Sequence, residues 1–224
     1  MKLLLTSGGV TNASIREALV GLLGKPIEDS SALFIPTAQW GHPWCGPESV
    51  RRAVMGAAIG DPGLVDLGWR SLGVLELTAL PSLSEERWTP WVREADALLV
   101  DGGEAMYLAH WLRESGLADL FPSLEDTVWV GLSAGSMVMT PRIGEQFRGW
   151  RPGDPDEPLG LVDFSIFPHL DYPGWESNTL ERARQWATGI PGPSYAIDDQ
   201  TAIVVTDGAV DVVSEGQWEI LTPR

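Results

Sequence analysis

One serine of this chain stands in a sequence context that can make a hydroxyl group nucleophilic. Ser133 is the centre of Gly131-Leu132-Ser133-Ala134-Gly135, a segment of the form G-x-S-x-G. In that form, small residues allow a sharp turn between a strand and a helix, so the serine hydroxyl projects beyond the sheet. An apolar run precedes the segment, and a helix beginning at Ala134 would favour negative charge near its N-terminus. We therefore predict a nucleophilic Ser133; the alternative is a serine in an ordinary turn.

A serine nucleophile needs a base to accept its proton, and the chain has 3 histidines. His42 lies in a loop rich in Trp and Pro, and His110 lies within an expected helix, where a core histidine is the more ordinary role. In enzymes with a G-x-S-x-G turn the base usually follows the serine in the chain, and only His169 does so. We predict that His169 is the general base, with a structural loop histidine as the alternative.

Acyl transfer also needs two N–H groups that bind the negative charge of a tetrahedral intermediate. The backbone N–H of Ala134, directly after the serine, is the first candidate. The second lies in Asp101-Gly102-Gly103, which follows an apolar run and ends without bulky side chains. We predict an oxyanion hole formed by Ala134 and Gly103, with Gly103 preferred to Gly102; a plain tight turn is the alternative.

The order of apolar and amphipathic segments predicts the scaffold that must position these residues. Short apolar runs alternate with helical patterns, which is typical of a mainly parallel sheet with crossover helices. From residue 195 onward, alternation and glycine turns predict short antiparallel strands. We predict an α/β fold in a single domain, 1–224: a three-layer sandwich with a mainly parallel central sheet, a nucleophile elbow, and short antiparallel strands at the C-terminal edge. Strands are expected at 3–6, 32–35, 97–100, 128–130 and 164–167, and helices at 12–23, 47–59, 84–95, 104–116 and 175–187.

Composition and charge narrow the class of protein. Hydrophobic residues make up 44% of the 224 residues and charged residues 21%, which fits a folded globular protein. No apolar run approaches the roughly 20 residues of a membrane span, and the one at the start is too short for a signal peptide. A net charge of −16 disfavours nucleic acid as a partner, because phosphates would be repelled. The single Cys45 cannot form an internal disulfide, which agrees with a soluble cytoplasmic protein.

Four segments together resemble the peptidase E and cyanophycinase family of serine peptidases, whose fold is similar to that of class I glutamine amidotransferases. The resemblance covers about residues 1–206 and implies a triad of serine, histidine and a carboxylate, with no metal or other cofactor. It also implies small peptides as substrates, with N-terminal aspartate preferred in the dipeptidase branch, and it is compatible with a homodimer. The segments, in the family's order, are Thr6-Ser7-Gly8-Gly9, Val100-Asp101-Gly102-Gly103, Gly131-Leu132-Ser133-Ala134-Gly135-Ser136 and Phe167-Pro168-His169.

The resemblance leaves the acidic member of the triad open. In aspartyl dipeptidase-like members this carboxylate lies somewhat beyond the helix after the nucleophile, and Glu145 is the nearest acid in the matching stretch. We predict that Glu145 orients His169, with Asp163 and Asp171 as alternatives. Glu104 stands where the family often has Asn. It could bind the α-ammonium group of a peptide, or it could stabilise the first turn of its own helix.

A preference for N-terminal aspartate would need a local cation, because a chain with net charge −16 repels anionic peptides at long range. Arg142 and Arg148, together with Arg151, flank a loop rich in Gly and Pro that is expected to cover the serine. An arginine can bind a carboxylate through two parallel hydrogen bonds. We predict that Arg142 and Arg148 bind substrate; the alternative is that these arginines only solubilise the loop.

Two other functions are compatible with such a fold. A glutamine amidotransferase-like or other acyl-transfer enzyme would normally carry cysteine at the elbow, so Ser133 argues against it. A non-catalytic binding member would use the fold without chemistry. Covalent labelling of Ser133 would exclude this last possibility.

Overall fold

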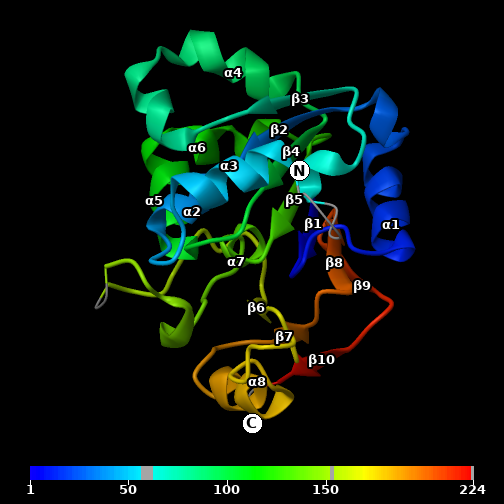
Figure 1. The fold of residues 1–224 in the computed structure, drawn as a ribbon, viewed down its shortest axis with the longest axis vertical. Helices are drawn as coiled ribbons and strands as arrows, with labels where there is room; N and C mark the ends of the chain where they lie inside the picture. Colours follow the sequence, from blue (N-terminus) through cyan, green and yellow to red (C-terminus); the bar gives the residue numbers. More distant parts are fainter. Residues whose placement is uncertain (57–62, 152–153, 223–224) are drawn as a thin grey trace.

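Two β-sheets organise the protein, whose computed structural model describes residues 1–56, 63–151 and 154–222 (Figure 1). The larger sheet is 7-stranded, in the order β3-β2-β4-β5-β1-β8-β9. The smaller is 3-stranded, in the order β10-β7-β6, and lies with α8 beyond one end of the larger sheet. The strands are β1 (Lys2–Thr6), β2 (Ser31–Ile35), β3 (Ser71–Val74), β4 (Ala97–Val100), β5 (Val128–Leu132), β6 (Ser165–Phe167), β7 (Ser194–Ile197), β8 (Thr201–Thr206), β9 (Ala209–Ser214) and β10 (Trp218–Leu221).

The strand directions bring the predicted site residues to one edge of the larger sheet. Strands β3, β2, β4, β5 and β1 are mutually parallel, whereas β8 is antiparallel to β1 and β9 is antiparallel to β8. The register pairs Thr6 with Leu132 and Val100 with Gly131, so β1, β4 and β5 end side by side. Loops that follow these three strands therefore meet at their carboxyl ends, where ligands bind in open α/β sheets.

Helices cover both faces of the larger sheet, and this produces three layers. Because side chains alternate along a strand, Leu5 of β1 packs in the cluster that contains Trp88 and Leu108, whereas Leu4 packs in the cluster that contains Ile15. The predicted three-layer α/β sandwich is confirmed. The helices are α1 (Ala13–Leu23), α2 (Ala38–Gly41), α3 (Pro47–Met55), α4 (Glu85–Arg93), α5 (Ala105–Glu114), α6 (Leu117–Leu120), α7 (Ala134–Met137) and α8 (Leu180–Ala187).

Some predicted boundaries differ from the observed ones for local reasons. The helix expected at 175–187 begins only at Leu180, because Thr179 caps it by accepting the backbone N–H of Arg182 on its hydroxyl at 3.3 Å. The helix expected at 47–59 is α3, which ends at Met55; residues 57–59 lie outside the described residues. The long loop after Pro141 contains one 3₁₀ turn, Glu145–Phe147.

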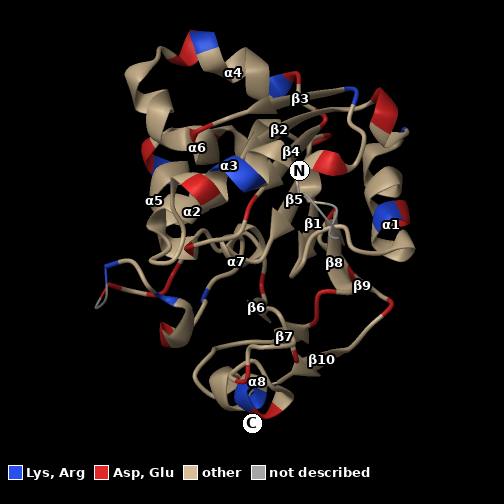
Figure 2. Ribbon diagram, in the orientation of Figure 1, with Lys and Arg blue, Asp and Glu red and all other residues tan. Residues whose placement is uncertain are grey.

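Acidic side chains outnumber basic ones 31 to 15. Figure 2 shows the positions of Asp and Glu along the ribbon, on helices and on the connections between strands, including the connection from β7 to β8. Within the described ranges, no helix is both long enough and apolar enough to cross a membrane.

Candidate active site

The predicted nucleophile occupies a strained turn at the end of β5. Ser133 is half-buried and has φ 50° and ψ −109°, a conformation that residues with a side chain rarely adopt. A Cβ atom at Gly131 would lie 2.7 Å from the Ser136 nitrogen, and one at Gly135 would lie 2.8 Å from the Val100 carbonyl carbon. The glycines on either side of Ser133 are therefore required sterically.

Three hydrogen bonds fasten this turn to the carboxyl end of β1. The Ser133 N–H donates to the Thr6 carbonyl at 2.9 Å, and the Ser136 hydroxyl donates to the same oxygen at 2.8 Å. The Thr6 hydroxyl in turn donates to the Gly131 carbonyl at 2.7 Å. These contacts with the turn explain why the apolar strand β1 ends in the polar residue Thr6.

The predicted base is held by the residue that follows Thr6. His169 donates its backbone N–H to the Ser7 hydroxyl oxygen at 3.0 Å, and that hydroxyl donates to the Ile197 carbonyl at 3.0 Å. The backbones of Ser133 and His169 are therefore bonded to two adjacent residues. This arrangement brings the two predicted residues to the same end of β1.

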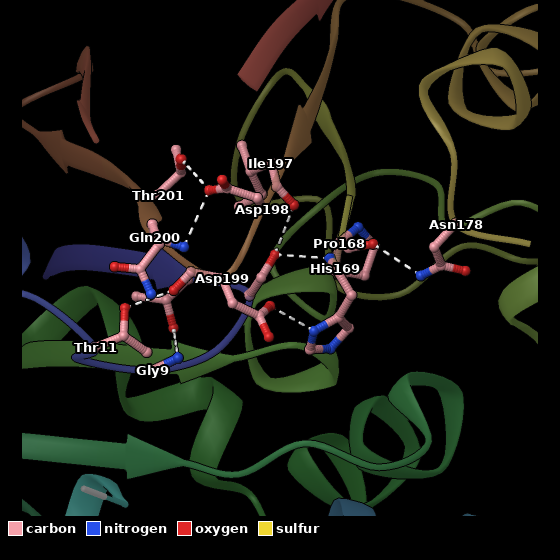
Figure 3. A network of polar contacts seen from close by, with 12 residues as sticks. Gly9, Thr11, Pro168, His169, Asn178, Ile197, Asp198, Asp199, Gln200 and Thr201 are labelled. Atoms are coloured by element: carbon pink, nitrogen blue, oxygen red, sulfur yellow. Dashed lines mark hydrogen bonds and ion pairs between the residues drawn. The ribbon is translucent and has the colours of Figure 1, made fainter. Parts of the chain in front are cut away.

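The carboxylate that contacts His169 is Asp199 (Figure 3). His169 Nδ1 lies 2.7 Å from Asp199 Oδ1, and the two side chains are 12% and 23% exposed. The Thr11 hydroxyl donates to the Asp199 carbonyl at 2.5 Å, and a Cβ atom at Gly8 would lie 2.7 Å from that of Asp199. Because Nδ1 is bonded to a carboxylate, Nε2 is the imidazole nitrogen left to accept a proton.

This geometry corrects the prediction that Glu145 orients His169. The Glu145 side chain is 88% exposed, and its ion-pair partner lies three residues further along the same turn. The two alternatives, Asp163 and Asp171, are also exposed. Among these acids, none has a hydrogen bond or ion pair to His169 in the described part of the chain, whereas Asp199 does.

Sequence reasoning missed Asp199 because it searched close to the serine. The preceding Asp198 shapes the turn by accepting the backbone N–H groups of Gln200 at 3.0 Å and Gln217 at 2.5 Å, and the Thr201 hydroxyl at 2.6 Å. The available signal was a pair of adjacent acids between two short strands. Nothing in that signal indicates which part of the protein the turn will contact.

The predicted oxyanion residues adjoin the serine. A Cβ atom at Gly102 would lie 3.4 Å from that of Ser133, and Gly103 has φ 142°, which favours glycine. Gly102 donates its N–H to the Asp101 side chain at 2.8 Å, whereas no hydrogen bond engages the Gly103 N–H among the described residues. Ala134 is the first residue of α7, so its N–H has no acceptor within that helix.

Glu104 is buried, and both of its carboxylate oxygens are occupied. It caps α5 by accepting the Tyr107 N–H at 2.5 Å, and its other oxygen accepts the N–H groups of Gly149 at 3.0 Å and Trp150 at 3.1 Å. This corrects the prediction that Glu104 binds substrate. The alternative prediction, that it stabilises the first turn of its helix, agrees with the structure, and Glu104 additionally anchors the loop at 149–150.

The three arginines of the long loop have different surroundings. Arg142 donates its Nε–H to Asp156, a side chain that is 6% exposed, at 2.7 Å, and this corrects the prediction that Arg142 is available to substrate. The guanidinium of Arg151 lies 4.2 Å from the ring centroid of Trp150. The Arg148 side chain is 12% exposed, and its ion-pair partner is an exposed glutamate. Arg148 therefore remains the one predicted binding arginine without a buried anion beside it in the described residues.

A cavity of about 370 Å³ lies beside Asp199. Asp171, Tyr172 and Asp198 are among the described residues that line it, and neither Lys nor Arg is among them. No group of three or more His, Cys, Asp or Glu side chains is arranged to hold a metal ion in the described part of the chain.

Comparison with known proteins gives both a family and a fold. The model of peptidase family S51 matches residues 3–213. A "putative peptidase E protein" from Listeria monocytogenes EGD-e is similar in structure, with a TM-score of 0.68 and 21% identity over 96% of this chain and 98% of its own. A peptidase from an acI-B1 Actinobacterium is also similar, with a TM-score of 0.63 and 20% identity over 99% of this chain and 90% of its own. No protein with curated annotation matches the sequence.

Proposed function

The chain belongs to peptidase family S51 and is a serine-type peptidase, and we propose that Ser133, His169 and Asp199 form its catalytic triad. The observation that carries this proposal is the 2.7 Å contact between His169 Nδ1 and Asp199 Oδ1. The backbone N–H of His169 is hydrogen-bonded to Ser7, and the backbone N–H of Ser133 is hydrogen-bonded to the adjacent Thr6. A nucleophile, a base and an orienting carboxylate are the three parts that acyl transfer by a serine requires.

In this mechanism Ser133 Oγ attacks the carbonyl carbon of the scissile peptide bond while His169 Nε2 accepts the hydroxyl proton. His169 then gives that proton to the leaving amine, and water hydrolyses the acyl-enzyme with His169 again as base. Asp199 accepts Nδ1–H, which selects the tautomer and stabilises the imidazolium ion. The N–H groups of Gly103 and Ala134 bind the oxyanion of each tetrahedral intermediate.

Covalent labelling tests the nucleophile. A fluorophosphonate should form an adduct on Ser133, located by peptide mapping, and the Ser133→Ala variant should give no adduct and no peptide hydrolysis. His169→Ala should label much more slowly, because the base that activates the hydroxyl is gone. An adduct on another residue, or substantial hydrolysis by Ser133→Ala, would remove Ser133 from the mechanism.

For substrates, we propose short peptides with N-terminal aspartate preferred, and Arg148 as the cation that binds the aspartate side chain. The partner of Arg148 is Glu145, which is 88% exposed, and exposed ion pairs contribute little stability. A substrate carboxylate could therefore replace Glu145 through two hydrogen bonds. The backbone N–H groups of the two residues after Arg148 donate to the side chain of Glu104, and Glu104 directly follows Gly103. This connection supports a position of Arg148 near the proposed oxyanion hole.

The specificity test compares hydrolysis of the dipeptides Asp-Leu, Asn-Leu and Ala-Leu. Asp-Leu should be cleaved fastest, and Arg148→Ala should abolish its advantage over the neutral isostere Asn-Leu. Arg151→Ala is the matched control, since it removes an arginine of the same loop whose guanidinium lies over a tryptophan ring. Equal rates for Asp-Leu and Asn-Leu in the unaltered protein would contradict the aspartate preference while leaving the triad intact.

A further inference from the structure

Asp101 and Gln39 form a buried polar pair that the proposed triad does not use. Asp101 is 9% exposed and Gln39 is 8% exposed, and Gln39 Nε2 donates a short hydrogen bond to Asp101 Oδ2. In the described part of the chain no ion pair involves Asp101, and Gln39 Oε1 is buried without a hydrogen-bond partner. Burying a carboxylate with no cation beside it costs stability, and carboxylates in such surroundings are concentrated at functional sites.

The pair lies directly behind the turn that supplies Gly103. Of the four consecutive N–H groups in this turn, three are engaged. That of Asp101 bonds to the end of β2 at 3.1 Å, that of Gly102 to Asp101 Oδ1 at 2.8 Å, and that of Glu104 to the Ala38 carbonyl at 2.9 Å. The Gly103 N–H alone has no acceptor among the described residues.

Helix α2 supports the same turn from outside the sheet. Its second residue is Gln39, and a Cβ atom at Gly103 would lie 2.6 Å from the Gln39 nitrogen. On the other side, a Cβ atom at Gly102 would lie 3.4 Å from that of Ser133. Rotation of the peptide unit between Gly102 and Gly103 would exchange the direction of the Gly103 N–H with that of the Gly102 carbonyl, so the orientation of this unit decides whether a donor or an acceptor faces Ser133.

We propose that Asp101, held by Gln39, is a positioning residue: its carboxylate engages the Gly102 N–H and thereby leaves the Gly103 N–H directed at the substrate oxyanion. This inference rests on the proposed function of Ser133 and Gly103. Oxyanion contacts act mainly in the transition state, so lost positioning lowers kcat more than it raises KM.

The protonation state of Asp101 adds a measurable signature. Burial raises the pKa of Asp101 to about 6, against the lowering effect of the hydrogen bonds from Gln39 and Gly102. A neutral carboxyl group is a weaker acceptor for the Gly102 N–H than a carboxylate. Its O–H can also donate to Gln39 Oε1 once the amide rotates, which gives that buried oxygen a partner.

Few other titratable groups surround Asp101. Strands β2 and β5 and helices α2 and α7 carry none. Glu104 precedes α5, and its oxygens face the N–H groups of that helix and of the loop at 149–150, while Tyr107 packs against α2. Glu76 bonds to the residue before α2, and His169 belongs to the proposed triad. None of these forms an ion pair with Asp101 in the described residues.

The test compares Asp101→Asn and Gln39→Met with a matched control, Asp96→Asn. Asp96 stands at the other end of β4 and also accepts a backbone N–H, that of Ser31, at 2.8 Å. At pH 8, Asp101→Asn should lower kcat for dipeptide hydrolysis by about 10- to 100-fold, with KM little changed. Its thermal unfolding midpoint should not fall, because a buried charge has been removed. Asp96→Asn should keep the kcat of the unaltered protein.

The pH profile separates positioning from a merely structural role. Protonation of Asp101 should lower kcat by about 10- to 100-fold on the acid side, in addition to the fall that loss of the catalytic base produces. The slope of log kcat should therefore exceed one near the pKa of Asp101, and Asp101→Asn should remove this additional fall. The hydrogen bond from Gln39 lowers the pKa of Asp101, so Gln39→Met should raise that pKa and move the corresponding fall in kcat to higher pH.

Several results would overturn the inference. These are an unchanged kcat and pH profile in both Asp101→Asn and Gln39→Met, failure of Asp101→Asn to fold, or a loss of activity that merely follows the loss of folded protein. Absence of fluorophosphonate labelling at Ser133 in the unaltered protein would instead remove the proposed function itself. The two failures are therefore distinguishable.

Discussion

His169 Nδ1 lies 2.7 Å from Oδ1 of Asp199, a residue of the turn between β7 and β8. The segment after β1 holds both partners, because Ser7 accepts the N–H of His169 and Thr11 donates to the carbonyl of Asp199. The last residue of β1 accepts the N–H of Ser133. One short stretch, residues 6–11, therefore contacts all three members of the proposed triad.

Exchanging the acids tests which of them orients the base. Asp199→Asn should lower kcat by about 10³- to 10⁴-fold, because an amide holds the imidazole in the wrong tautomer. Glu145→Gln is the control and should keep its kcat, since the Glu145 side chain is exposed and has no hydrogen bond or ion pair to His169 among the described residues. Initial rates at saturating dipeptide measure both. A strong loss in Glu145→Gln with a normal Asp199→Asn would reverse the assignment.

Substitution of His169 should affect turnover, whereas substitution of His110 should affect stability. His169→Ala should lower turnover by about 10³-fold or more, as loss of a triad member does in other serine enzymes. His110→Ala should mainly lower stability, because that ring packs against Trp111 and Trp150 at centroid distances of 5.2 and 5.0 Å. Turnover and thermal unfolding measured on both variants check this, and an essential His110 would contradict it.

The strained backbone conformation of Ser133 should lower the free energy of unfolding of the protein. Ser133→Gly should be inactive yet more stable by about 1 kcal/mol, because glycine adopts a positive φ without steric strain. Ser133→Ala should be inactive with nearly unchanged stability, since alanine keeps the strain. Urea unfolding of the three proteins provides the free energies of unfolding. A destabilised Ser133→Gly variant would argue that the turn is relaxed.

Glu104 should act on stability more than on substrate. Glu104→Gln replaces a carboxylate oxygen that accepts backbone N–H groups, so the free energy of unfolding should fall by about 1–3 kcal/mol. The exposed Glu114, at the other end of α5, offers a control in Glu114→Gln. A large rise in KM for unblocked dipeptides at unchanged stability would restore the ammonium-binding role.

Asp101 should make the protein less stable as the pH rises through its titration. Burial raises its pKa from 3.8 to about 6, so between these values the folded protein binds more protons than the unfolded chain. Stability from this group is therefore greatest below the unfolded value and is lost as the pH approaches the folded value, a change of about 3 kcal/mol. The difference in unfolding free energy between Asp101→Asn and the unaltered protein, measured from pH 4 to pH 8, isolates the effect. A difference that does not vary with pH would contradict it.

The sequence by itself determined the layers of the fold and the local form of the nucleophile turn. Consecutive apolar residues such as Leu4 and Leu5 point to opposite faces of a strand, so an apolar run already predicts that both faces of the sheet are buried. The glycines around Ser133 already imply a backbone too crowded for side chains. These features could be predicted because strand periodicity and close backbone approach act over a few neighbouring residues. The family resemblance, confirmed by the match to residues 3–213, depends on the same short segments.

Only the tertiary structure decided which carboxylate contacts His169 and which charged side chains are already engaged by other residues. Asp199 reaches His169 because β8 pairs antiparallel with β1, and no local pattern encodes that pairing. Glu104 had two open roles until its burial and its bonds to the loop at 149–150 assigned it to a helix cap. A carboxylate has the same side chain wherever it stands, so its role depends on contacts between residues far apart in the chain. Those contacts follow from strand order and packing, which the sequence encodes only collectively.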